Sequence, residues 1–228
     1  MEDHELGRDG FALREGVLSP PEVDAILDAI AEAQQRPGRP HAIRNLFDEV
    51  PAIRSLARAG PVRSLVEPTL GPGCFAVRGL FFDKTPTANW KVPWHQDLTI
   101  TVRERADRPG FGPWSEKAGI THVRPPVEIL ERMVAVRLHL DDCGPENGPL
   151  QVIPGSHRQG RLDHEAGPRW AGSDWTLACI VGRGGALLMR PLLLHASSVA
   201  TEPGHRRVVH LEYAADELPT GMSWRDRW

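Results

Sequence analysis

The order of hydrophobic and polar positions divides the chain into a helical first third and a strand-rich remainder. In the first third, LSPPEVDAILDAIAEAQQ places apolar residues at helical spacing, with Ser19 as the N-cap and prolines at the first helical positions. The later stretch VPAIRSLARAGPVRSLVEPTLG predicts one or two further short helices, which end at Pro68 and Gly71. We therefore expect a helical flank over about residues 1–72.

After Gly73 the pattern changes to short apolar runs separated by glycine, proline and asparagine. Six of these runs predict strands: CFAVRGLFF, MVAVRLHLDD, LQVIPG, TLACIVG, GALLMRP and RVVHLEY. Asn147-Gly148 is a pair that favours a tight hairpin turn. Helices followed by many strands predict an antiparallel, mainly β fold, and a double-stranded β-helix (a cupin-like jelly roll) over about residues 73–215 fits best.

One segment interrupts the strand pattern. Residues 101–132, TVRERADRPGFGPWSEKAGITHVRPPVEILER, are charged and rich in proline and glycine. Ordered domains seldom carry so long a loop unless it covers or forms a binding site. We therefore expect a lid-like insertion here.

Composition excludes several classes of protein. The length of 228 residues suits a single domain, 1–228, and the net charge of −3, from 27 basic and 30 acidic residues, carries no block that indicates nucleic acid. No run approaches 18 apolar residues, so we expect no membrane span. The N-terminus has no apolar signal segment, and the three cysteines form no CxxC pair. These features predict a cytoplasmic protein; its oligomeric state is left open.

The stretch VPWHQDLTI contains the first candidate for chemistry. His95 and Asp97 are separated by one residue, so in an extended strand both side chains leave the same face. His195 follows the apolar run ALLMRPLLL. A lone histidine in such a place is more often a core residue than a ligand, but the upstream His-x-Asp pair in a mainly β chain favours a shared metal site.

Two histidines and one aspartate form the facial triad of mononuclear non-haem Fe(II) sites, which leaves positions open for a bidentate co-substrate and O₂. Zinc accepts the same ligand atoms. A 2-oxo acid that chelates the iron would leave its distal carboxylate in the barrel, where an arginine suits it. Arg206 and Arg207 are the candidates, and the alternation of Val209 and Leu211 favours Arg207.

With these residues assembled, the chain resembles the phytanoyl-CoA dioxygenase-like family of Fe(II)- and 2-oxoglutarate-dependent oxygenases. The matching motifs are WHQD at Trp94–Asp97, LDDCGPENGPLQVIPGSHRQG at Leu140–Gly160, and HASS followed by HRRVVHLEY within His195–Tyr213. HxD alone is a weak motif, whereas the three in this order are specific.

The resemblance implies a set of site residues. It assigns His95, Asp97 and His195 as the iron ligands, Arg206 as the anchor of 2-oxoglutarate and Ser197 as a second contact to that co-substrate. Arg206 is then preferred over Arg207, on the ground that bulges at strand ends change which face a residue occupies.

The resemblance also implies a reaction and one departure. The reaction is oxidation of a C–H bond of a small-molecule substrate by O₂, coupled to conversion of 2-oxoglutarate to succinate and CO₂. Because Asp97 is present, hydroxylation or another oxidation is favoured over halogenation, whose enzymes lack this carboxylate. Many members carry an asparagine where this chain has Ala200-Thr201, so no asparagine contact is expected there.

Three further residues have a functional and a structural interpretation. Arg137 interrupts an apolar strand, so it either binds a carboxylate or phosphate of the substrate or forms an ordinary ion pair. Trp114, in the expected lid, either closes over the substrate or lies in a solvated loop. Trp94 either keeps the site dry or simply packs in the core.

Two rival functions are weighed: one uses the same triad, and the other keeps the fold without redox chemistry. The first is a zinc-dependent hydrolase or isomerase with a cupin-like fold, which requires a general base beside a metal-bound water and has no use for a buried arginine. The second is a non-catalytic jelly-roll binding module. The substrate itself is not identified by the sequence.

Overall fold

The computed structural model describes residues 4–35, 41–163, 169–170 and 174–228. The α-helices are α1 (His4–Arg8), α2 (Pro20–Gln34), α3 (Leu46–Glu49), α4 (Ala52–Arg58), α5 (Gly60–Leu70) and α6 (Val127–Glu131). The strands are β1 (Phe11–Arg14), β2 (Ala42–Ile43), β3 (Phe75–Lys84), β4 (Val92–His95), β5 (Ile100–Val102), β6 (Trp114–Lys117), β7 (Ile120–Val123), β8 (Met133–His139), β9 (Leu150–Val152), β10 (Leu177–Cys179), β11 (Ala186–Met189), β12 (His195–Ser197) and β13 (Arg206–Ala214).

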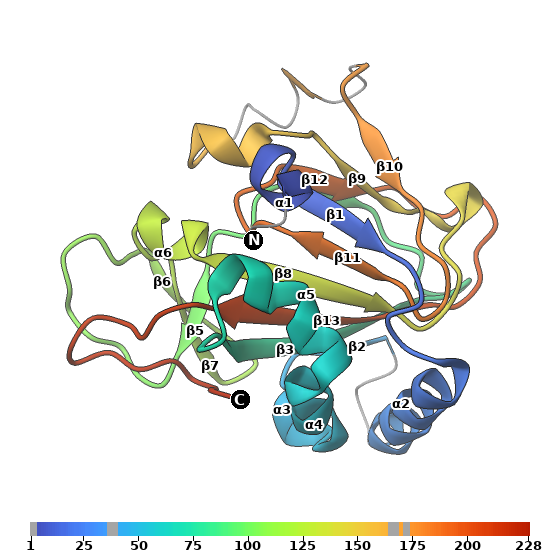
Figure 1. Ribbon diagram of the computed structural model, residues 1–228, viewed down its shortest axis with the longest axis horizontal. Coiled ribbons are helices and arrows are strands. Elements are labelled where there is room, and N and C mark those ends of the chain that lie inside the picture. The colour runs from blue at the N-terminus through green and yellow to red at the C-terminus, as the bar shows by residue number, and fades with distance from the viewer. Residues whose placement is uncertain (1–3, 36–40, 164–168, 171–173) are drawn as a thin grey trace.

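Two antiparallel sheets form the body of the fold. The larger has the strand order β1-β11-β8-β13-β3-β2, and the smaller has the order β10-β9-β12-β4. The chain passes repeatedly between the two sheets, as in a jelly roll: β8 lies in the large sheet, β9 and β10 in the small one, β11 in the large one, β12 in the small one and β13 in the large one. Figure 1 shows the two sheets as separate layers. The expected double-stranded β-helix is confirmed.

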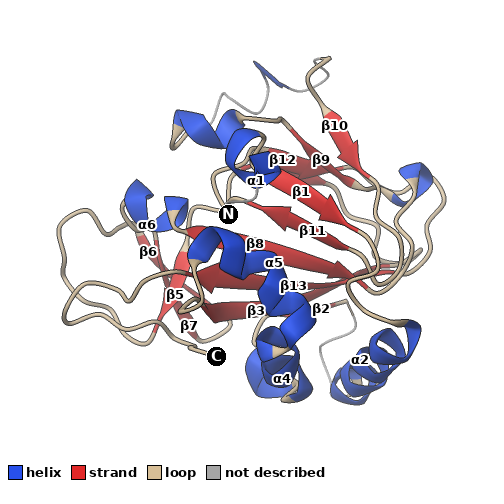
Figure 2. Ribbon diagram, in the orientation of Figure 1, coloured by secondary structure: helices blue, strands red, loops and turns tan. Residues whose placement is uncertain are grey.

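The two faces of the large sheet have different partners. Its outer face contributes Val136, Leu138, Val209, Leu211 and Tyr213 to a buried apolar cluster with helices α2 to α5. Figure 2 shows these helices gathered at the large sheet and strands making up most of the remaining body. The inner face faces the small sheet, and side chains from both sheets form a second apolar cluster between them.

The N-terminal flank is partly as predicted. α2 begins after Ser19, and the Glu22 carboxylate accepts hydrogen bonds from the Ser19 backbone N–H and hydroxyl at 2.7 and 2.6 Å. The prediction that Pro68 ends a helix is wrong, because α5 continues through it to Leu70. The flank is also not purely helical: β1 pairs with β11 and β2 pairs with β3, so both extend the large sheet.

The predicted strand runs all contain strands, but the turn at Asn147-Gly148 differs from the expectation. A 3₁₀ helix, Pro145–Asn147, precedes Gly148, which has φ +60°. The segment connects β8 in the large sheet to β9 in the small one. It therefore crosses between sheets instead of closing a hairpin.

The segment 101–132 is more ordered than a loop. β5, β7 and β6 form a three-stranded antiparallel sheet in which Trp114 pairs with Val123, and α6 follows. The sheet has its own buried cluster, which includes Ile100, Val123 and Leu130. The sequence did not predict these strands, because each has only three or four residues and so shows too little alternation of apolar and polar positions. A role as a lid stays a prediction.

No α-helix among the described residues is long and apolar enough to cross a membrane.

Candidate active site

A cavity of about 310 Å³ opens between the two sheets. The large sheet contributes side chains from β3, β8 and β13, and the small sheet contributes β4, β9 and β12. His95, Asp97, His195, Ser197 and Arg206 all line it. The cavity therefore brings together the residues that the sequence singled out from motifs up to about 110 positions apart.

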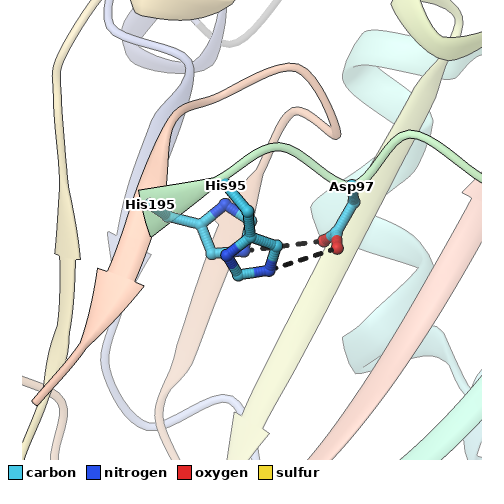
Figure 3. Close-up of side chains that lie close together, drawn as sticks. All are labelled: His95, Asp97 and His195. Carbon is cyan, nitrogen blue, oxygen red and sulfur yellow. Dashed lines mark ion pairs between the residues drawn. The ribbon is translucent and has the colours of Figure 1, made fainter. Parts of the chain in front are cut away.

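Two neighbouring strands bring the histidines together. β12 pairs with β4 so that His195 lies directly opposite His95, and the ring centroids are 4.1 Å apart. Asp97 faces both rings: its Oδ1 lies 3.8 Å from His95 Nε2 and its Oδ2 lies 3.7 Å from His195 Nε2 (Figure 3). One ligand atom from each residue lies within 4.8 Å of the other two. These three groups are placed to share one metal ion.

Hydrogen bonds to the backbone set the tautomers of both rings. His95 Nδ1 donates to the Pro93 carbonyl at 2.8 Å, and His195 Nδ1 donates to the Leu193 carbonyl at 2.9 Å. A carbonyl can only accept, so the proton is on Nδ1 and the Nε2 lone pair is free. Metal-binding histidines are commonly oriented in this way.

The protonation states also suit metal binding. Burial lowers the pKa of His195 to about 4, so its ring is neutral at neutral pH. Burial would raise the pKa of the Asp97 carboxyl, but the nearby rings of His195 and His210 hold it below its usual value. The site thus presents the neutral ring of His195 and the carboxylate of Asp97, protonation states that suit a metal.

The strand argument for the His-x-Asp pair was only partly correct. β4 ends at His95, and Asp97 lies just beyond it. The Asp97 backbone N–H donates to the Pro191 carbonyl at 2.8 Å, which ties this turn to the segment before β12. Asp97 therefore faces the histidines because of this connection, and not because of strand alternation.

A second polar group lies in the same cavity. Ser197 Oγ lies 3.2 Å from Arg206 Nη1 and donates to the Gly148 carbonyl at 3.0 Å, and Arg206 Nη1 donates to the same carbonyl. Arg206 is buried, and its Nε has no hydrogen-bond partner among the described residues. An unpartnered buried guanidinium N–H is costly, so this arrangement favours an anionic ligand.

Lys84 belongs to this group, although the sequence did not indicate it. It lies opposite Arg206 in the β3–β13 pairing. Its Nζ donates to Ser197 Oγ at 2.9 Å and to the Ser198 carbonyl at 2.6 Å. Burial, with Arg206 nearby, lowers the pKa of Lys84 to about 8. Two basic residues and a hydroxyl thus share one corner of the barrel.

Arg207 lies elsewhere. Its guanidinium makes hydrogen bonds of 2.8 and 2.6 Å to the Asp141 carboxylate, and its backbone N–H donates to the same group. Alternation correctly grouped Arg207 with Val209 and Leu211, but that face packs against the helices. The opposite set, Arg206 and His210, faces the cavity. The bulge that we invoked is not the reason, because the β3–β13 register shifts only between Glu212 and Tyr213.

The remaining wall is a chain of polar side chains. Arg137 Nη1 lies 3.2 Å from His210 Nδ1, and His210 Nε2 lies 3.5 Å from Glu212 Oε1. Arg78 donates to Glu212 Oε1 at 3.0 Å, and its Nη2 lies 3.3 Å from His122 Nε2. His122, within the segment expected to form a lid-like loop, is buried on β7. The sequence signal that could have identified His210 and Glu212 is the alternation of polar and apolar residues in RVVHLEY.

The two tryptophans that were considered do not line this cavity. Trp114, on β6, packs against the apolar cluster of the three-stranded sheet, and the Arg105 guanidinium carbon lies 5.6 Å from its ring centroid. It is not among the described residues that line the cavity, so the structure does not bring it to the triad. Trp94 lines a separate cavity of about 450 Å³ on the other side of His95.

Known proteins share this sequence pattern and fold. The family model of phytanoyl-CoA dioxygenase matches residues 6–208. An L-proline trans-4-hydroxylase of Streptomyces griseoviridis is 28% identical over 246 aligned residues, which cover 91% of this chain and 83% of the relative.

Two solved structures resemble the whole chain. The non-haem α-ketoglutarate-dependent carbocyclase SnoK of nogalamycin biosynthesis superposes with a TM-score of 0.73 at 17% identity, covering 97% of this chain and 84% of that one. EctD of S. alaskensis, solved with 2-oxoglutarate and 5-hydroxyectoine, gives a TM-score of 0.71 at 21% identity, covering 92% and 74%. At these identities the structures show a shared fold. The family match over most of the sequence shows more: the chain belongs to the phytanoyl-CoA dioxygenase family of Fe(II)- and 2-oxoglutarate-dependent oxygenases.

Proposed function

We propose that this protein hydroxylates an unactivated C–H bond of a small molecule, using Fe(II), O₂ and 2-oxoglutarate. One observation carries the proposal. Two imidazole Nε2 atoms and a carboxylate converge in one cavity that also holds a buried arginine whose Nε has no partner among the described residues. A metal and a chelating dianion would satisfy both features at once.

The residues fit iron by their donor set and their protonation. His95, Asp97 and His195 offer two imidazole nitrogens and one carboxylate oxygen, the set typical of Fe(II) sites that keep coordination positions open. We assign these three residues as the metal ligands.

The residues also fit 2-oxoglutarate. Arg206 and Ser197 lie at the end of the cavity formed by β12 and β13, and Lys84 adds a further positive charge behind Ser197. A planar guanidinium binds a carboxylate through two parallel hydrogen bonds. We assign Arg206 as the anchor of the distal carboxylate and Ser197 as its second contact.

The chemistry divides between the cofactors and the chain. When bound, iron, O₂ and 2-oxoglutarate supply the oxidising power for hydroxylation, with release of succinate and CO₂. The chain holds and orients these groups and excludes water. Apolar side chains in the cavity wall serve the last role; they include Leu80, Phe82, Trp90, Val92 and Leu150.

The zinc hydrolase is less well supported by the same cavity. Such an enzyme needs a general base beside a metal-bound water. Besides Asp97, the carboxylate among the described lining residues is Glu212, which Arg78 already binds at 3.0 Å. The buried Arg206 also has no role in that reaction. A non-catalytic binding module remains the second rival, and the experiment below addresses it.

The test is an anaerobic titration of metal-free protein with Fe(II) and then 2-oxoglutarate. Chelation of iron by the keto acid produces a weak visible charge-transfer band. We expect the band in the wild type, and we expect Arg206→Met to raise the Kd for 2-oxoglutarate by roughly 10- to 100-fold, the effect of losing a charge-assisted pair.

Arg207→Met is the matched control, because Arg207 lies on the same strand and binds Asp141 instead of facing the cavity. It should leave the band and the affinity unchanged. Absence of the band in the wild type, or tight binding of zinc alone, would refute the oxygenase proposal. A normal band without succinate production in a broad substrate screen would favour the binding module.

A further inference from the structure

The cavity carries more positive charge than the cofactors need. Its described lining residues include five arginines and lysines but only two carboxylates, Asp97 and Glu212. Bound Fe(II) and the dianion 2-oxoglutarate would add equal and opposite charge. The surplus therefore persists in the loaded enzyme, and it favours a further anion in the cavity.

Most of these cations already have an assigned partner or role, or lie at the rim of the cavity. Arg137 has no such assignment and does not lie at the rim. Arg206 is the proposed co-substrate anchor, and Arg78 is held by Glu212 at 3.0 Å. Among the described residues no carboxylate lies within 4.0 Å of the Arg137 guanidinium, and its Nε is buried without a hydrogen-bond partner. A cation in this state lacks a counter-ion.

The geometry shows which part of Arg137 is free. Its Nη1 donates to His210 Nδ1 at 3.2 Å, so His210 acts as an acceptor there and presents its own N–H toward Glu212. The Phe82 ring centroid lies 6.0 Å from the guanidinium carbon and supports one side. The edge that includes Nε is left for a ligand. A fork held in one orientation by a hydrogen bond and an aromatic ring suits two parallel bonds to a planar anion.

Position within the barrel separates this group from the co-substrate anchor. Arg137 pairs with His210 across β8 and β13, and Arg206 lies four residues before His210, at the start of β13. Four residues of strand span roughly 13 Å. In the proposed function one carboxylate of 2-oxoglutarate would be held at the metal ligands and the other by Arg206, so neither would be left for Arg137.

We infer that Arg137, oriented by His210, binds the carboxylate of the substrate, and that the substrate is a small carboxylic acid such as an amino acid. The inference rests on the proposed function, since it assigns the second organic ligand of the same site. A single guanidinium beside one histidine fits a monocarboxylate better than a phosphate dianion, which takes more donors. A cavity of about 310 Å³ also limits the substrate to a small molecule.

The experiment compares acids with their amides in the Fe(II)- and 2-oxoglutarate-loaded protein. The probes are L-proline and L-prolinamide, followed by the other common L-amino acids and their amides. Binding is measured anaerobically as the change in the visible band, and turnover in air as succinate formed. In the wild type we expect at least one acid to bind tenfold or more tightly than its amide.

Substitution then assigns the preference to one residue. Arg137→Met should weaken binding of that acid at least tenfold, leave binding of its amide nearly unchanged, and leave the Kd for 2-oxoglutarate within about threefold of the wild-type value. Arg137→Lys should restore part of the preference, because it keeps the charge but not the fork. Arg207→Met, a salt-bridged arginine outside the cavity, is the control and should behave as the wild type.

The contrary outcomes are separable. No acid preference in a wild type with a normal band would overturn this inference alone, and so would an Arg137→Met protein that loses 2-oxoglutarate affinity but keeps the acid preference. In the second case Arg137 would be a co-substrate contact. Failure of the wild type to form the band would refute the proposed function, and this inference with it.

Discussion

Lys84 offers a test of the electrostatics at the co-substrate end of the barrel. The residue is 1% exposed, and its ammonium contacts a hydroxyl and a carbonyl but forms no ion pair with a carboxylate among the described residues. Burial, and then the charge of Arg206, lowers its pKa from 10.5 to about 8. The folded protein therefore resists protonation of this lysine.

The sign and size of the effect follow from linkage. Between pH 8 and 10.5 the unfolded chain holds a proton on this lysine that the folded chain has released. The free energy of unfolding therefore rises with pH across this window. The lowered pKa corresponds to about 3 kcal/mol in total, of which about 2 kcal/mol falls between pH 7.5 and pH 10.

Lys84→Met should remove this contribution. Urea unfolding followed by tryptophan fluorescence at pH 7.5 and pH 10 gives the free energy of unfolding of each protein. The wild type should gain about 2 kcal/mol relative to the variant on going to the higher pH. Comparing the two proteins cancels the other groups that titrate.

Lys91→Met is the matched control, because Lys91 is exposed on the loop before β4. It should leave the pH dependence of the wild type unchanged. The free energies of unfolding of the wild type and Lys84→Met could instead differ by the same amount at both pH values, to within about 0.5 kcal/mol. In that case the Lys84 ammonium is solvated, and the inference that burial lowers its pKa is wrong.

Three further predictions concern other parts of the molecule. Tyr213 is fully buried and its hydroxyl donates to the Ala57 carbonyl at 2.8 Å, so Tyr213→Phe should lower the free energy of unfolding by about 1–2 kcal/mol in urea; no change would mean that water replaces the bond. Gly148 has φ +60°, and an added Cβ would lie 2.7 Å from the Ser198 carbonyl oxygen. Gly148→Ala should therefore lower the free energy of unfolding by about 1–3 kcal/mol and raise the Kd for 2-oxoglutarate in the anaerobic titration. An unchanged Kd would show that the Gly148 carbonyl does not position Arg206 and Ser197. Fe(II) at a hundredfold excess over its Kd should stabilise the protein by about 2.7 kcal/mol in a thermal-shift assay under anaerobic conditions, and a chelator should reverse this; equal stabilisation of His195→Ala would place the metal elsewhere.

Sequence periodicity was most successful where one face of an element is buried. The helix after Ser19 and the six strand runs were found because each has an apolar face that packs against a neighbour. The three residues of the triad could also be selected from the sequence, since HxD and a histidine after an apolar run are local signals. The three-stranded sheet within 101–132 was missed, because strands of three or four residues with charged neighbours give too little periodicity.

Long-range pairing explains what the sequence could not provide. Lys84 has no motif around it, and it becomes part of the site only because β3 pairs with β13 and sets it opposite Arg206. His122 reaches Arg78 across two separate sheets. Such contacts depend on the register between strands that lie far apart in the chain, and no local pattern encodes that register.

The choice between Arg206 and Arg207 shows how a binding cavity reverses the usual inference from alternation. In a strand with one buried face, the apolar set normally points to the interior. β13 is covered on both faces: helices pack on Val209, Leu211 and Tyr213, and the opposite set lines the cavity. The apolar face is therefore the outer face of the barrel, and the polar face is the inner one. In a jelly roll with a helical flank, a strand such as RVVHLEY, whose two faces differ in polarity, points its polar side toward the ligand, and Arg206, His210 and Glu212 follow this rule. Arg137 on the neighbouring strand obeys it as well, since Val136 and Leu138 face the helices while Arg137 faces the cavity.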